Sequence, residues 1–178
     1  MLWLSENTAP EPPLALVEAC HTRIVRQCDT LEKLLAYWPL HGIDMAVQQA
    51  AAQVERYFSK AAPDHHADEE KDLFPALAAY LPSQQLKMLC AQHRSLEAAW
   101  AQLQPDLIAL SRGITPSDSQ WLTRVADFVT QNRAHYQFED HEIIPLARAQ
   151  LSAATLAQLD ASMAARRRQT PSIHQTAQ

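Results

Sequence analysis

Two stretches of the chain place a histidine and a glutamate four residues apart. They are HHADEEKDLFP at 65–75 and HYQFEDHEIIP at 135–145. The stretches align without a gap, so that His65 matches His135 and Glu69 matches Glu139. Side chains four positions apart lie on one face of a helix, with Cβ atoms roughly 5–6 Å apart. Imidazole and carboxylate groups together bind first-row divalent metals, so each stretch predicts part of a metal site.

One further histidine precedes each pair. His21 stands 44 residues before His65, and His93 stands 42 residues before His135. The chain therefore repeats one helical hairpin twice, with His on the first arm and His-x-x-x-Glu on the second. In an antiparallel bundle, residues at mid-height on all four helices can converge. We expect four imidazoles and two carboxylates to meet in the middle of the bundle.

This set of side chains suits two divalent metal ions that share both carboxylates. A buried carboxylate without a partner costs several kcal/mol, so such groups normally pair or bind metal. Imidazole with carboxylate favours iron, with manganese or zinc less expected, while calcium and magnesium prefer sites made of oxygen alone. The predicted metal ligands are His21, His65, Glu69, His93, His135 and Glu139.

Two acidic residues leave alternatives open. Asp140 lies five positions after His135 and could replace Glu139 as a bridge. Glu97 lies four positions after His93, where it is either a solvated acid or a seventh ligand that makes the two metals unequal. Solvated surface positions are expected for three other histidines, namely His41, His66 and His174.

The elements that carry these residues are expected to be helices. The chain has only two glycines, and alanine and leucine are abundant, which favours an all-α fold. Five helices are predicted, at about 14–38, 44–80 with a kink or break at Pro63, 83–111, 115–149 from a Thr115 N-cap, and 152–167. Short connections between the first four imply an antiparallel up-down-up-down four-helix bundle, followed by a short C-terminal fifth helix.

The domain organisation is simple. Residues 1–13 are predicted to be an irregular lead-in, 14–167 a single bundle domain, and 168–178 a disordered tail. The formal net charge is −5 and no basic stripe crosses the domain, which argues against nucleic acid as a partner. The basic run Arg166–Arg168 is interpreted as a solvated helix end.

A cytoplasmic location is expected. No apolar run reaches the roughly 18 residues of a membrane span, and the first residues lack the features of a signal peptide. Three cysteines, an odd number, fit a reducing compartment and are interpreted as buried core residues.

The two His-x-x-x-Glu stretches resemble the signatures of the hemerythrin-like HHE cation-binding domain family. The resemblance covers about residues 14–150. It implies an antiparallel four-helix bundle with a non-haem di-iron centre, and it places the family's ligands on the same six residues. The pattern on the fourth helix is more similar to the repair-of-iron-centres branch than to oxygen-carrying hemerythrins. Those carriers have a histidine where this chain has Glu97.

These features predict a di-iron protein whose centre meets O₂, NO or peroxide, in stress response, sensing or iron-centre repair. Replacement of a histidine by Glu97 would make the iron more electron-rich and favour reaction over reversible binding. The alternative is a metal-dependent binding or sensor module without turnover, in which metal sets stability or a surface for a protein partner.

Overall fold

The computed structural model describes residues 14–116 and 120–169, and over these ranges every regular element is helical. The elements are α1 (Ala15–His41), α2 (Met45–Asp68), η1 (Glu69–Leu73), α3 (Phe74–Leu77), α4 (Ser83–Ser111), α5 (Trp121–Phe138), η2 (Glu139–Ile143), α6 (Ile144–Gln150) and α7 (Ala153–Gln169). The labels η1 and η2 denote π-helical turns. The predicted all-α class is confirmed.

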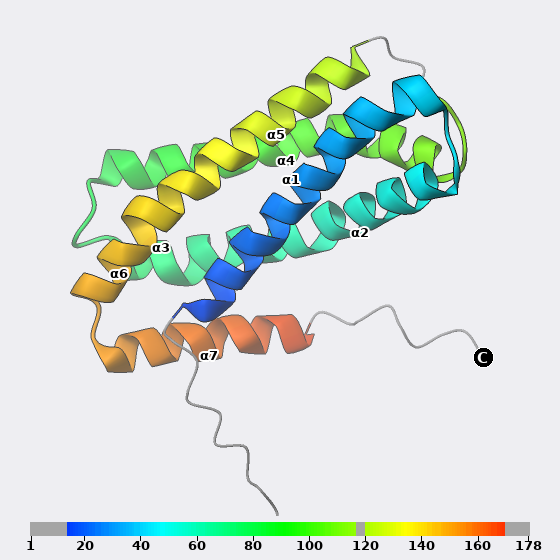
Figure 1. Cartoon of the computed structure of the whole chain (residues 1–178). Helices are drawn as coiled ribbons and strands as arrows, with labels where there is room; N and C mark the ends of the chain where they lie inside the picture. The colour runs from blue at the N-terminus through cyan, green and yellow to red at the C-terminus, as the bar shows by residue number, and fades with distance from the viewer. Residues whose placement is uncertain (1–13, 117–119, 170–178) are drawn as a thin grey trace, which may run out of the picture.

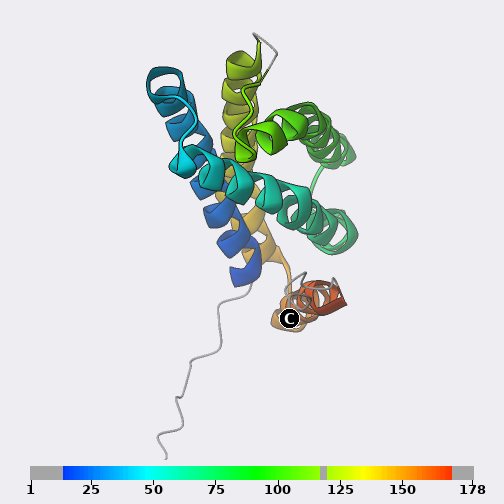
Figure 2. The ribbon, with the colours of Figure 1, turned by 90° about the vertical axis from the view of Figure 1, so that its right-hand side faces the viewer.

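Four long helices form the bundle and alternate in direction along it (Figure 1). Helix α1 packs against α2 and α5, and α4 packs against the same two helices, so the four close into a ring. Figure 2 shows this bundle turned by 90°, with α7 outside it. The predicted antiparallel bundle with a short C-terminal helix is confirmed. Within the bundle, η1 and α3 extend α2, and η2 and α6 extend α5.

The apolar core consists of two clusters with a polar layer between them. On α1, Val17 belongs to one cluster and Ile24 to the other, with His21 between the two in sequence. On α4, Leu89 and Trp100 are divided in the same way around His93. The helices therefore bury their apolar residues on both sides of the histidines and hold the polar layer away from water.

Helix α1 is longer than the sequence predicts. It continues through Pro39 to His41, beyond the predicted end at about Trp38. Proline lacks one N–H group, and a single missing bond in the last turn is not enough to stop the helix. The end comes at Gly42, whose φ of 77° is reached easily by glycine. Its N–H donates to the Trp38 carbonyl over 2.8 Å.

Two other helix boundaries also differ from prediction. Helix α5 begins at Trp121, and Thr115 and Pro116 lie outside it, so Thr115 is not its N-cap. The rest of that expected start, residues 117–119, lies outside the described residues, as do the predicted lead-in at 1–13 and most of the tail. Pro63 lies inside α2, which runs unbroken to Asp68.

Helix α7 lies against α1, α2 and η1. Arg166 binds Asp68 and Asp72, and Arg167 also binds Asp68, which is fully buried. The prediction that Arg166 and Arg167 form a solvated helix end is therefore wrong, because the buried Asp68 and the partly buried Asp72 hold them. No described helix combines the length and the apolar character that crossing a lipid bilayer requires.

Candidate metal centre

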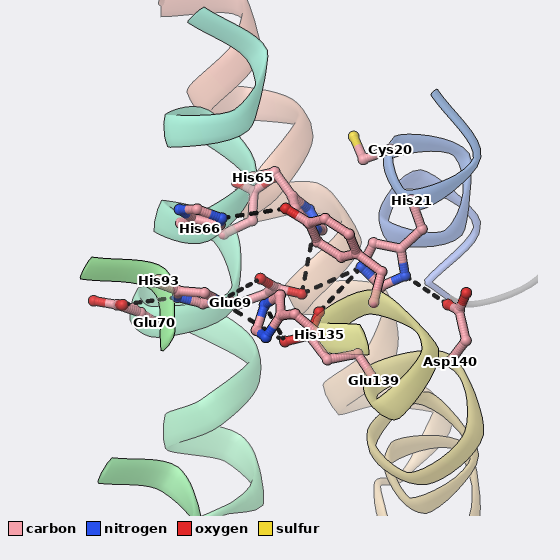
Figure 3. Close-up of polar contacts among 12 residues, drawn as sticks. Cys20, His21, His65, His66, Glu69, Glu70, His93, His135, Glu139 and Asp140 are labelled. Carbon is pink, nitrogen blue, oxygen red and sulfur yellow. Dashed lines mark hydrogen bonds and ion pairs between the residues drawn. The ribbon is translucent and has the colours of Figure 1, made fainter. Parts of the chain in front are cut away.

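The six predicted ligands converge in the polar layer between the two apolar clusters (Figure 3). Each residue is at most 3% exposed. The carboxylates of Glu69 and Glu139 lie at the centre, and the Nε2 atoms of the four histidines point toward them. Nε2 of His65 lies 3.4 Å from Glu69 Oε1, and Nε2 of His135 lies 3.3 Å from Glu139 Oε1.

The first-arm histidines each face both carboxylates. Nε2 of His21 lies 3.5 Å from a Glu69 oxygen and 3.4 Å from a Glu139 oxygen. For His93 the corresponding distances are 3.4 Å and 3.8 Å. Three groups of side chains have ligand atoms within 4.8 Å of one another, and one of them joins His66 to His93 and His135. The other two overlap and consist of the six predicted ligands alone. They are His21, His65, Glu69 and Glu139, and Glu69, His93, His135 and Glu139. Each group has two imidazoles, and both carboxylates are shared.

The atoms that face this centre have no hydrogen-bond partner among the residues that the structure describes. They are the Nε2 atoms of all four histidines and both oxygens of both glutamates. Buried polar atoms are nearly always paired, and an unpaired cluster calls for an ion or water. Four nitrogen and four oxygen lone-pair donors arranged around one space fit a pair of metal cations.

Outer contacts fix the orientation of three histidines. Nδ1 of His21 donates to Asp140 Oδ1 over 2.5 Å, and Nδ1 of His93 donates to Glu70 Oε1 over 2.8 Å. A carboxylate only accepts, so the Nδ1 atom carries a proton and Nε2 is the nitrogen left to bind a metal ion. Nδ1 of His135 lies 3.0 Å from Gln92 Oε1 in the same role.

These contacts establish the role of Asp140, one of the two acidic residues for which the sequence left alternatives. Asp140 contacts the outer nitrogen of His21 and lies outside both ligand groups. Glu70 holds the matching position after Glu69 and contacts His93 in the same manner. The repeat therefore supplies each first-arm histidine with an acid from the other hairpin, at the position directly after a central glutamate.

Glu97 lies further from the centre. Its Oε1 is 3.0 Å from Nδ1 of His66, and half of its side chain is exposed. His66 is only 5% exposed, stacks on His93 with ring centroids 4.0 Å apart, and has Nε2 3.3 Å from the Tyr136 hydroxyl. The expectation of a solvated His66 is wrong. The repeat contained the missed signal, because His66 and Tyr136 occupy equivalent positions directly after His65 and His135.

The two buried carboxylates of the centre need positive charge close to them. Burial lowers the pKa of His65 and His135 despite the nearby glutamates. Burial also opposes the charged form of His21 and His93, but contacts with acidic side chains outweigh it and raise their pKa to about 12 and about 10. The pKa of Glu69 lies well below its usual range despite burial, because His65, His21 and His93 surround it. Without metal, protons on His21 and His93 balance the two central carboxylates.

A π-helical turn begins at each central glutamate. The N–H of Phe74 donates to the Glu69 carbonyl, and the N–H of Ile144 donates to the Glu139 carbonyl, both five residues back. A proline follows directly, Pro75 in one case and Pro145 in the other. A proline ring clashes with the carbonyl four residues earlier in an α-helix, and a widened turn relieves that clash. Such turns are frequent at functional sites. The Glu-x₅-Pro spacing is the same at both turns.

The geometry defines a class of protein, a four-helix bundle with a buried histidine–carboxylate cation site. Comparison with known proteins gives the family. Residues 13–147 match the hemerythrin HHE cation binding domain, and the chain belongs to this family. It is also 34% identical over 158 residues to an uncharacterized protein of Haemophilus influenzae, a match that covers 87% of this chain and 90% of that protein. Helix α7 lies outside the part that matches the family.

Proposed function

We propose that this chain is a non-haem di-iron protein whose centre interacts with O₂, NO or peroxide. The observation that carries the proposal is the pair of overlapping four-residue groups that share Glu69 and Glu139. Two carboxylates that belong to both groups would offer oxygen atoms to each of two neighbouring cations.

The donor set supports iron. Mixed imidazole and carboxylate donors suit redox-active first-row metals, whereas structural zinc sites close with four tetrahedral ligands. Two imidazoles and two shared carboxylates give each ion about four protein donors, fewer than the six of octahedral coordination. Iron bound there would supply redox chemistry and open coordination positions for a diatomic molecule or peroxide.

The residues of the chain divide the remaining tasks. His21, His65, His93 and His135 would serve as terminal ligands, and Glu69 and Glu139 as bridges. Asp140 and Glu70 hold the outer nitrogens of His21 and His93. The apolar clusters on both sides exclude water from the layer. The proposed roles are stress response, sensing or iron-centre repair, the last as in the repair branch that the fourth-helix pattern resembles.

Metal content is the first test. The full chain would be purified without affinity metals or chelators from iron-replete cells, and metals counted by plasma mass spectrometry. About two irons per chain are expected, followed by a change in the visible spectrum on addition of O₂, NO or peroxide. One zinc or none in folded protein would overturn the di-iron proposal. Two irons per chain with no spectral response to O₂, NO or peroxide would support the di-iron assignment. The same result would contradict the proposal that the centre interacts with these molecules.

A second candidate is a metal-dependent module without turnover that presents a surface to a protein partner. It is favoured by Asp68, which directly precedes Glu69 and holds Arg166 and Arg167 of α7. Occupancy of the centre could thereby change the position of α7. Amide hydrogen exchange tests this candidate function. If it is correct, removal of the metal should raise the exchange rate along α7 more than along α1. Equal protection of α7 in loaded and metal-free protein would exclude it.

A further inference from the structure

A groove lies between α1, α2 and α7. Its lining includes Cys20, which directly precedes His21 and is labelled beside it in Figure 3. Its volume is about 480 Å³, within the roughly 300–1,000 Å³ of small-molecule sites. Helix α1 contributes Cys20 and Arg23, α2 contributes Arg56 and Lys60, and α7 contributes Arg167. The groove belongs neither to the ligand cluster nor entirely to the matched family domain, because α7 closes it.

The groove gathers positive charge on an acidic protein. Four of its lining residues are cationic, namely Arg23, Arg56, Lys60 and Arg167, and Asp64 is the one carboxylate among the described residues that line it. The whole chain carries a formal net charge of −5. Arg167 shares its charge with Asp68, and Asp64 offsets part of the rest, but cations remain in excess in the lining. An excess of cations in a concave site raises the local concentration of anions and favours their binding.

Arg167 is held in place in the wall of this groove. Its guanidinium binds the buried carboxylate of Asp68 and donates from Nη2 to Cys20 Sγ over 3.2 Å. Nη1 also contacts the Met163 carbonyl at 3.4 Å. These contacts use part of the five N–H groups of arginine. A cation fixed in this way binds an anion with little loss of side-chain entropy.

The second hairpin provides an internal comparison. Its equivalent groove, between α4 and α5, includes Gln92 and Ser95, the counterparts of Cys20 and Arg23, and has a volume of about 210 Å³. The counterparts of Arg56 and Lys60 are Ala126 and Thr130. The repeat alone therefore does not require cations in this groove. They are specific to the hairpin that α7 covers.

We propose that the groove between α1, α2 and α7 binds a small, multiply charged oxyanion, a phosphate ester or a polycarboxylate. Arg167 would contact it from the wall, and Arg23, Arg56 and Lys60 from the rim. The site is separate from the metal centre and does not depend on which metal is bound there. Its ligand is a small molecule because the groove is bounded on three sides by helices.

The test replaces the three rim cations by their counterparts in the second hairpin, in the variant R23S/R56A/K60T. Arg167 is left in place because it also neutralises buried Asp68. The control variant K33A/K87A/R112A removes the same charge at exposed positions that do not line the groove. Titration calorimetry on the full, metal-loaded chains would use inorganic phosphate and propane-1,2,3-tricarboxylate as probes, with metal content measured before and after.

We expect the native chain to bind at least one probe, and binding to weaken as salt rises. The rim variant should lose about tenfold or more in affinity, and the control should stay within about twofold. The tighter probe then identifies the class of ligand. Equal affinity of the rim variant and the native chain would overturn the proposal and locate the anion elsewhere, such as the metal centre. Failure of the native chain to bind either probe would overturn it as well.

Discussion

Glu69 and Glu139 each bring two oxygen atoms into the polar layer, and within the described part of the chain no hydrogen-bond donor satisfies any of them. At the scale of single residues, these unpaired buried oxygens are the strongest indication that a cation binds in this layer. A buried carboxylate costs several kcal/mol unless a cation compensates it. The shared position of both carboxylates in the two ligand groups explains why one hairpin alone does not make a complete site.

Replacing Glu139 by Gln should reduce metal content from about two ions per chain to about one or fewer. The amide lacks the charge and offers only one oxygen donor in place of two. Glu142→Gln is the matched control, because Glu142 lies on the same π turn and is exposed. Plasma mass spectrometry gives the metal content, and circular dichroism shows that both variants are folded. Two ions retained in Glu139→Gln would contradict a bridging role.

Asp140→Asn and Glu70→Gln should each weaken metal binding by about 10- to 100-fold, the usual loss when an outer contact of a metal-binding histidine is removed. Both acids hold an Nδ1 atom in the donor state. Glu97→Gln should leave affinity within about twofold, because Glu97 contacts His66 and lies outside the ligand groups. Competition with a coloured chelator measures all three. A large loss in Glu97→Gln alone would indicate a different arrangement of the centre.

At the scale of elements, periodicity predicted most of the bundle. The four long helices and the convergence of His21, His65, His93 and His135 follow from spacing along the chain, because helices of similar length in antiparallel order align their midpoints. That these residues bind metal stays a prediction. The burial of His66 could not be predicted from residue spacing, because Tyr136 and His93, which contact it, lie on other helices.

The positions of α7 and the π turns were also beyond local sequence. Arg166–Arg168 has the composition of a solvated helix end, and only the fold brings Asp68 and Asp72 to it. The π turns arise where the register on both sides is fixed by buried residues such as Leu73 and Phe74, so the helix must accommodate Pro75 within its length. Long-range contacts decide both features.

Removing α7's two bound guanidiniums should destabilise the bundle. In R166A/R167A the fully buried Asp68 loses its partners, and breaking a buried ion pair from one side costs about 2 kcal/mol or more, even with the arginines partly exposed. The measurement is urea unfolding of metal-free protein. Arg168→Ala, at an exposed position, serves as control. Adding Asp68→Asn to the double variant should recover part of the loss, and no recovery would argue against an unpaired charge as the cause.

At the scale of the whole molecule, the polar layer links stability to pH. His65 and His135 have pKa values lowered by burial, so below their ordinary value of 6.5 the unfolded chain binds protons that the folded chain does not, and stability falls as pH falls. His21 and His93 have pKa values raised to about 12 and about 10. Above 6.5 the folded chain keeps protons that the unfolded chain releases, and stability falls as pH rises.

Metal-free protein should therefore be most stable near the ordinary histidine pKa of 6.5 and lose stability between about pH 7 and about pH 8.5, an upper limit set by the ordinary pKa of a thiol, above which thiol ionisation adds to the change. Two retained protons set the limit of this slope at about 3 kcal/mol per pH unit. Metal should replace the protons of His21 and His93, so the loaded protein should lack this decline and metal affinity should rise with pH. Thermal unfolding of both forms across this range gives the comparison, with His93→Gln expected to flatten the metal-free decline by about half. Metal-free stability that stays constant or increases from pH 7 to 8.5 would mean that the centre balances its carboxylates without protons on these two histidines.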